Sequence, residues 1–534
     1  MLRRPSVPRT AGKIRGRENE EVGMASMEGA LRRETSREGK VPEDFLFGVS
    51  NAGFQVEGGY NVPGGPHNNW AAWEREGKVQ RPGAACRFWE KYLEHVELAS
   101  SLGLNAFRFS LEWSRIQPGT EGERNAPPPF DQEALNRYAA IASAIMDAGM
   151  EPVITLHHFT HPAWCGTDLW LDPDGPQLFA EYVRQAVTGL NRRLLQQGKR
   201  AIRLWVTINE PNILGLLMYV LGEHPHGKKG LVQARKATEN LVIAHVRAYN
   251  AIHDAYEEMG WGQPLVSFNN YGMCFYALDK ALYDLVRAPS RGVRAEELPA
   301  YLKEKRKAWR ERFDRLAAEK WGRGSLRFRY YLLLENIYNR LADPSGSRRS
   351  VEAIYGSPRG GLVDYIALDI YDPFSAANPP KLPSPRRLRE GEPLLYTPLW
   401  ENFYRAGEFG GVIRGYAEDA GSLPIYILEN GMCHRQPLEG GPFPRRDGLT
   451  RDVFLRDMLG EVAACLQEGI RLKAYSYWSL TDNYEWGSFE PRFGLYEYDF
   501  RAGRILERDG LGKEAGRTYA QLVEDLRAGG RGRS

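Results

Sequence analysis

Two hydrophobic patterns alternate along the chain from residue 41 onward. Short apolar runs rich in β-branched and aromatic side chains predict buried strands, and longer stretches with apolar positions every three to four residues predict amphipathic helices. The predicted strands cover residues 45–50, 105–110, 152–156, 204–210, 265–269, 365–370, 425–428 and 472–478. The main predicted helices cover residues 87–102, 131–148, 177–195, 232–259, 403–420, 451–468 and 513–526.

A repeated order of strand and helix is typical of an α/β fold, and eight such units predict a (β/α)8 TIM barrel. A doubly wound sheet is the alternative, and it would need a glycine-rich phosphate loop after an early strand. No G-x-G-x-x-G or P-loop pattern occurs at such a place. We therefore expect residues 41–528 to form a single barrel domain.

Three segments depart from this rhythm. Residues 281–361 form a long charged insertion between the fifth and sixth predicted strands, with helical patterns at 299–320 and 326–341. Such an insertion is either a lid beside the functional site or a solvated surface feature, and the pattern leaves both open. Residues 1–40 are rich in charge and lack a hydrophobic signal core, which predicts a disordered extension. Residues 529–534 are expected to form a flexible tail.

Composition excludes several classes of function. The net charge is +3, from 71 basic and 68 acidic residues, so the protein as a whole gives no reason to expect a nucleic-acid partner. No apolar run reaches the length of a membrane-spanning helix. Neither a disulfide framework nor a zinc site is expected, because the five cysteines are scattered and form no C-x-x-C pair; a cytoplasmic location follows as the expectation.

Two predicted strands end in a glutamate that has little structural reason to be there. Glu210 ends one strand and is followed by Pro211, and Glu429 ends another before Asn430 and Gly431. The carboxyl ends of barrel strands form the active site. The other polar and aromatic residues near these ends are Gln55, Glu57, Arg108, His157, His158, Asn209, Asn269, Asn270, Tyr271, Asp369, Tyr371, Trp478, Asp482, Asn483, Glu485 and Trp486. None of these strand-end residues forms an H-x-H or H-E-x-x-H metal pattern, so this set favours a polyhydroxylated ligand, and we expect no metal or organic cofactor.

Glycoside cleavage explains why such a site would need two carboxyl groups. One must keep a proton for the leaving oxygen, and the other must stay ionised to attack or stabilise an oxocarbenium-like centre. Arg108 would help to hold one carboxylate ionised, and Tyr371 could donate a hydrogen bond to it. A buried salt bridge is the alternative role for each glutamate.

Several ordered motifs carry a resemblance to a known family. Residues 207–211 (TINEP), 427–431 (ILENG) and 477–486 (YWSLTDNYEW) resemble the three hallmark motifs of glycoside hydrolase family 1. Further matches are FQVEG at 54–58, FRFSLEWSRI at 107–116 and RFGL at 492–495. The matches occur in order over about residues 41–526 and are weakest across the charged insertion.

This resemblance implies a retaining β-glycosidase. Glu210 matches the general acid/base, and Glu429 matches the nucleophile that forms a glycosyl-enzyme intermediate. Asn209 matches the residue that binds the 2-hydroxyl of the sugar, and Trp478 matches the tryptophan on which the sugar ring stacks. The positions that match hydroxyl-binding residues are Gln55, His158, Glu485 and Trp486. Glu210 also argues against the thioglucosidase branch of the family, in which the acid is a glutamine.

Other positions bear on specificity. A carboxylate such as Glu485 would repel a phosphorylated sugar and can accept bonds from neutral hydroxyls. Phe159 stands where a tryptophan is common, which removes one ligand contact. Asp369 stands where an asparagine is usual, and its charge would raise the pKa of the nearby nucleophile.

Three functions stay open at this point. The first is hydrolysis of non-phosphorylated β-glucosides, galactosides or fucosides, with a small β-glycoside or oligosaccharide as the binding partner. The second is transglycosylation through the same intermediate. The third is a catalytically inactive barrel that only binds sugar. This function would require the loss of a catalytic carboxylate, and both Glu210 and Glu429 are present. A homo-oligomer is compatible with each.

Overall fold

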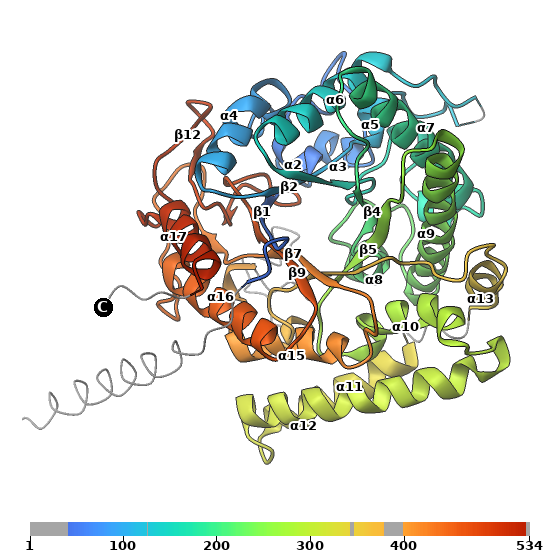
Figure 1. The fold of residues 1–534 in the computed structure, drawn as a ribbon, viewed down its shortest axis with the longest axis vertical. Helices are drawn as coiled ribbons and strands as arrows, with labels where there is room; N and C mark the ends of the chain where they lie inside the picture. The colour runs from blue at the N-terminus through green and yellow to red at the C-terminus, as the bar shows by residue number, and fades with distance from the viewer. Residues whose placement is uncertain (1–40, 125, 342–346, 379–398, 530–534) are drawn as a thin grey trace, which may run out of the picture.

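The computed structural model describes residues 41–124, 126–341, 347–378 and 399–529. Eight parallel strands form a closed barrel in chain order, with β9 pairing with β1 to close it (Figure 1). The strands are β1 (Leu46–Ser50), β2 (Ala106–Ser110), β3 (Glu151–Thr155), β4 (Leu204–Asn209), β5 (Leu265–Tyr271), β6 (Ile366–Asp369), β7 (Ile425–Asn430) and β9 (Leu472–Trp478). This architecture confirms the predicted (β/α)8 barrel.

Helices surround the barrel and cover its outer face (Figure 1). The long ones are α4 (Phe88–Ser101), α6 (Gln132–Asp147), α7 (Gly175–Gln196), α9 (Leu231–Met259), α15 (Ala406–Ala417), α16 (Arg451–Gln467) and α17 (Ala515–Arg527). The loops after the strands carry the short helices α2 (Gly53–Val56), α3 (Ala71–Arg75), α5 (Trp113–Ile116) and α8 (Pro211–Leu216). The small strands of these loops are β8 (His434–Arg435), β10 (Pro491–Arg492), β11 (Tyr498–Asp499) and β12 (Arg504–Ile505).

Local sequence signals fix where the long helices begin and end. Asp131 caps α6 by accepting hydrogen bonds from the backbone nitrogens of Glu133 and Ala134. Gly260 ends α9 with a φ of 66°, a left-handed conformation that glycine adopts without steric cost. These signals explain why the predicted helix bounds lie within a few residues of the observed ones.

The core has two layers because strand side chains alternate between the two faces of the sheet. One cluster fills the barrel interior and includes Val206, Ala367, Tyr426 and Leu428. A larger cluster lies between the strands and the helices, and Ile427 belongs to it. A strand of this barrel is therefore apolar on both faces, and a polar side chain near its end stands out.

The charged insertion is largely helical and lies on the outside of the barrel (Figure 1). It contains α10 (Ala281–Arg287), α11 (Leu298–Trp321), α12 (Leu326–Leu341) and α13 (Arg348–Tyr355). Trp309 and Phe313 of α11 are buried, and Lys320 at its end forms an ion pair with Glu408 of α15 at 2.8 Å. The insertion thus docks on α15. A role as a lid stays a prediction.

The remaining predictions on chain organisation fall partly outside the described residues. The expected extension 1–40 and most of the expected tail, residues 530–534, lie there. Among the described helices, none is both long and apolar enough to cross a membrane. The five cysteines, Cys86, Cys165, Cys274, Cys433 and Cys465, are all free and buried.

Candidate active site

The two strands that carry the glutamates depart from regular pairing near their carboxyl ends. On β6 and β7, Leu368 pairs with Ile427 but Asp369 pairs with Glu429, so β7 has one residue more than its neighbour at this point. Such an irregularity changes the face on which the following side chains lie. Leu428 belongs to the barrel interior, and the extra residue allows Glu429 to lie on that side as well.

A similar irregularity lies at the end of β4. Val206 pairs with Ser267 of β5 and Asn209 with Asn269, so β4 advances by one residue more than β5. Glu210 follows with a φ of 44°, a left-handed conformation that a non-glycine residue rarely adopts. Phe159 and Trp486 have positive φ values too. Residues held in this way concentrate at functional sites.

Glu429 is held by two donors and is 4% exposed. The Arg108 guanidinium donates to Oε1 through Nη1, and the Tyr371 hydroxyl donates to Oε2 at 2.9 Å. Burial raises the pKa of Glu429 above its usual value, and the charge and hydrogen bond of Arg108 and the bonds from Tyr371 and Asp369 oppose that rise. These donors favour the ionised form, which is the form a nucleophile needs.

Arg108 itself is completely buried on β2 and is fixed by several partners. Its Nη2 donates to Asn209 Oδ1 at 2.7 Å, and its Nε donates to Thr155 Oγ1 at 3.0 Å. Asn209 Oδ1 also accepts a hydrogen bond from Asn269 Nδ2 at 2.7 Å. One guanidinium therefore orients both Glu429 and the amide of Asn209.

Replacing Arg108 by lysine should move the acidic limb of the kcat/KM profile upward by about one pH unit. A single ammonium cannot bind Glu429 and Asn209 as the guanidinium fork does, so the Glu429 carboxylate would take up a proton more readily. A pH series with a nitrophenyl glycoside, on protein whose thermal unfolding is also recorded, measures this shift. An unchanged limb would show that Arg108 does not set the charge of Glu429.

Glu210 has a different environment although it lies close to Glu429. It is 6% exposed, and one carboxylate oxygen each of Glu210, Asp369 and Glu429 lie within 4.8 Å of one another. Burial and the neighbouring Asp369 and Glu429 charges raise the pKa of Glu210 well above its usual range. A carboxyl group with this pKa keeps its proton near neutral pH, as a general acid must.

The predicted sugar-binding residues form one connected group beside the carboxyl groups. Glu485 accepts hydrogen bonds from Trp478 Nε1 at 3.0 Å and from Gln55 Nε2 at 3.0 Å. Burial raises the pKa of Glu485 to about 7. Within the described part of the chain, Gln55 Oε1 is buried without a protein hydrogen-bond partner. Buried polar atoms are normally paired, so an unpaired one at this place suits a ligand hydroxyl.

Aromatic rings line the same part of the site. The His158 ring lies nearly parallel to Trp478 and Trp486, with interplanar angles of 6° and 10°. Burial, with nearby Arg108, lowers the pKa of His158 well below its usual range, so the imidazole is neutral. The Phe159 ring lies edge-on to the Trp486 ring, with 5.0 Å between the two ring centroids. Neutral imidazole and indole faces suit the mixed apolar and hydroxyl surface of a sugar.

Some polar residues near the strand ends do not join this group. Glu57 forms a buried ion pair with Arg115 at 2.5 Å, so it has the structural role considered for any buried carboxylate. Asn270 donates to the Asp279 carbonyl at 2.8 Å, and Asp482 lies 3.7 Å from Arg492. Being near the end of a strand was thus not sufficient to predict a site residue.

Two further residues contribute to the site without having been singled out individually from the sequence. Asn269 donates through its amide nitrogen to both Asn209 and Asp369, whereas the sequence shows it only as one of many polar residues near the strand ends. His224 is buried, and 5.2 Å separates the centroid of its ring from that of the Trp486 ring. His224 follows the π-helical segment Leu217–Leu221 that continues α8, where no strand end gives a sequence signal.

Comparison with known proteins places this site in a family. The sequence profile of glycosyl hydrolase family 1 matches residues 37–294 and 404–527. The chain belongs to glycosyl hydrolase family 1. The membership confirms the sequence prediction of a retaining β-glycosidase. The profile match does not include residues 295–403, which carry most of the insertion and also β6 with Asp369 and Tyr371.

Individual relatives span nearly the whole chain. The β-glucosidase A of Thermotoga maritima is 25% identical over 496 residues, covering 91% of this chain and 98% of the relative. The cytosolic β-glucosidase of Cavia porcellus is 26% identical over 489 residues, covering 86% and 93%. A solved structure of the Thermotoga maritima β-glucosidase in complex with glucoimidazole aligns with a TM-score of 0.64 at 21% identity. The alignment covers 91% of this chain and 99% of that one and shows the shared fold.

Proposed function

We propose that the enzyme hydrolyses β-glycosides by double displacement, with Glu429 as the nucleophile and Glu210 as the general acid/base. One observation carries these roles. One carboxylate oxygen of Glu210 lies within 4.8 Å of one of Glu429, and Arg108 and Tyr371 donate to Glu429. A separation near 5 Å is typical of retaining enzymes, since an inverting enzyme needs room for a water molecule between its carboxyl groups.

The chemistry follows from these two environments. In the first step Glu429 attacks the anomeric carbon, the glycosidic bond breaks, and the Glu210 proton goes to the leaving oxygen. In the second step a water oxygen attacks the anomeric carbon, Glu210 takes the proton of that water, and the ester bond to Glu429 breaks. Glu429 and Glu210 then return to their starting protonation states.

The substrate is proposed to be a non-phosphorylated β-glucoside, galactoside or fucoside. Glu485 supports this choice, because its carboxylate would repel a sugar phosphate and can accept bonds from neutral hydroxyls. Two relatives, from Thermotoga maritima and Cavia porcellus, are β-glucosidases, which supports a glucoside as the substrate. A panel of nitrophenyl β-glycosides tests the sugar directly. A clear preference for an α-glycoside would contradict the proposal.

Substituting Glu485→Gln should reduce kcat/KM for a neutral β-glucoside by about 100-fold, since hydrogen bonds to a charged acceptor contribute about 1.5–3 kcal/mol each. The same change should improve activity on a 6-phosphorylated glucoside relative to the neutral one, because the like charge is gone. Rates on the matched pair of substrates give the ratio. A ratio unchanged by the substitution would show that Glu485 does not select against phosphate.

Hydrolysis is favoured over transglycosylation, although both use the same intermediate. One relative of similar identity, from Delphinium grandiflorum, is named a glucosyltransferase that uses acyl-glucose, so product analysis with an added alcohol acceptor is informative. We expect free sugar as the main product. We also propose a cytoplasmic location, which the free and buried state of all five cysteines supports.

A further inference from the structure

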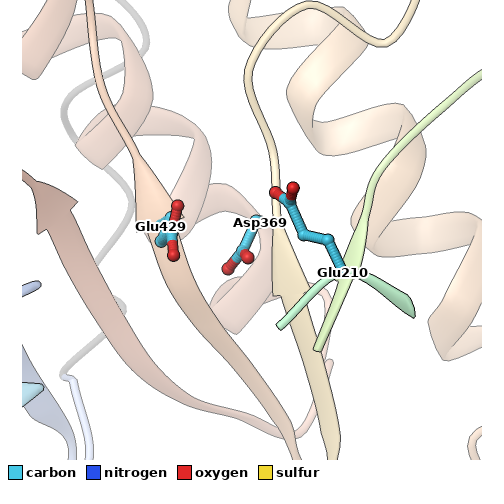
Figure 2. A group of neighbouring side chains, drawn as sticks. All are labelled: Glu210, Asp369 and Glu429. Carbon is cyan, nitrogen blue, oxygen red and sulfur yellow. The ribbon is translucent and has the colours of Figure 1, made fainter. Parts of the chain in front are cut away.

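The site contains a third carboxyl group, Asp369, that the double-displacement mechanism does not use. Asp369 ends β6 and pairs in register with Glu429 of β7. Figure 2 shows its side chain between those of Glu429 and Glu210. It is completely buried, and one carboxylate oxygen from each of the three residues lies within 4.8 Å of the other two.

The hydrogen bonds of Asp369 point to a proton. Its Oδ2 accepts a hydrogen bond from Asn269 Nδ2. Its Oδ1 is buried and has no protein hydrogen-bond partner among the described residues. A buried carboxylate oxygen without a donor is costly, and a proton held between two carboxyl groups removes that cost.

The charges around Asp369 lead to the same conclusion. The charged and titratable groups that face it are Glu210 from the end of β4, Glu429 from β7, Arg108 from β2 and the hydroxyls of Tyr271, Tyr283 and Tyr371. Burial raises the pKa of each of these tyrosines, so their hydroxyls stay neutral. Among the described residues, three carboxyl groups therefore face one guanidinium, that of Arg108, which is bound to Glu429.

We propose that Asp369 shares one proton with Glu210, so that the acid/base group of this enzyme is a pair of carboxyl groups. This inference rests on the proposed acid/base role of Glu210. Asp369 acts through Glu210 and is a positioning residue. Two carboxyl groups held close together cannot both ionise easily, and their titration belongs to the pair.

The effect of the pair can be followed through both steps. The negative charge left on the pair raises the affinity of Glu210 for its proton, so the acid form persists to higher pH before the first step. When the bond to the sugar forms, Glu429 loses its charge, and the proton moves from the pair to the leaving oxygen. In the second step Asp369 makes Glu210 a stronger base toward water. The proton count is balanced, and no further reactant is needed.

The electrostatics of the individual groups support this arrangement. Burial and the charge of Glu429 raise the pKa of Asp369 well above its usual range, against the effect of Arg108. Burial and the charges of Asp369 and Glu429 raise the pKa of Glu210. A divalent cation between the three carboxylates is the competing explanation, and the Arg108 charge on Glu429 opposes it.

The test compares Asp369→Asn with the wild-type enzyme in kcat/KM against pH on a nitrophenyl β-glucoside. Asparagine keeps the shape and can still accept the hydrogen bond from Asn269. Removing the acid should lower the alkaline limb by about one pH unit or more, because the neighbouring carboxylate no longer raises the pKa of Glu210. An alkaline limb that coincides with that of the wild type within about 0.3 unit would overturn the proposal.

A matched control is Asp279→Asn. Asp279 is also completely buried, but its carboxylate accepts hydrogen bonds from Tyr416 and the Met273 backbone nitrogen, outside the carboxyl group cluster. Its profile should follow the wild type. Activity that EDTA abolishes and a divalent cation restores would also overturn the shared proton. Should Glu210 and Glu429 variants retain full activity, the proposed function fails, whatever the Asp369 profile shows.

Discussion

Replacing Glu429 by glutamine lowers kcat/KM for a nitrophenyl β-glucoside by about 10⁴-fold or more, because the amide cannot attack the anomeric carbon. The fold should survive, since the glutamine carbonyl oxygen can still accept a hydrogen bond from Arg108 or from Tyr371. Steady-state kinetics of the variant and the wild-type enzyme, measured at matched enzyme concentrations, give the ratio of their kcat/KM values.

The control for this change is Glu524→Gln on the exposed surface of α17. It should retain wild-type kinetics, and all three proteins should show similar circular dichroism spectra. Near wild-type turnover in Glu429→Gln would show that another group is the nucleophile. Asp369 would then be the first candidate, since it pairs with Glu429 in the sheet.

Substituting Glu210→Ala removes the proton donor and leaves the nucleophile in place. We expect kcat for a substrate with a poor leaving group to fall by about 10²–10⁴-fold, the usual contribution of a general acid or base. A dinitrophenyl glycoside needs little protonation, so its first step should persist and its second step should become limiting. Added azide should then raise kcat and give a β-glycosyl azide.

The leaving-group dependence separates this role from a structural one. A variant that had lost only its fold would be equally slow on both substrates and would not respond to azide. An α-glycosyl azide would contradict the retaining mechanism. Without any azide response on an activated substrate, Glu210 would lose its assignment as the acid/base.

Much of the fold could be predicted because hydrophobic periodicity is a local property. The runs that end at Glu210 and Glu429 indicated strands, and the carboxyl ends of barrel strands meet at one mouth. The irregular pairing of β4 and β7 had no such local signal. Simple alternation would have placed Glu429 on the face opposite to Leu428, and the extra residue in β7 changes this.

The setting of Asp369 shows the same limit. The sequence predicted a third acid near the nucleophile, whose charge would raise the pKa of that nucleophile. The pKa of Glu429 is raised, but burial is the cause, and Asp369 lowers it through a hydrogen bond. The structure places Asp369 between Glu429 and Glu210, with an oxygen that has no donor among the described residues (Figure 2). Which of two neighbours a buried carboxyl group influences more depends on three-dimensional contacts, and so the effect on Glu210 could not be read from the chain.

Trapping the covalent intermediate tests the central claim most directly. The enzyme is incubated with a 2-deoxy-2-fluoro glucoside that has a good leaving group, and the intact mass and the peptides are then measured by mass spectrometry. The account predicts one sugar per chain, attached to Glu429. A sugar attached to Glu210 or Asp369, or an inactivated enzyme without any attached sugar, would contradict it.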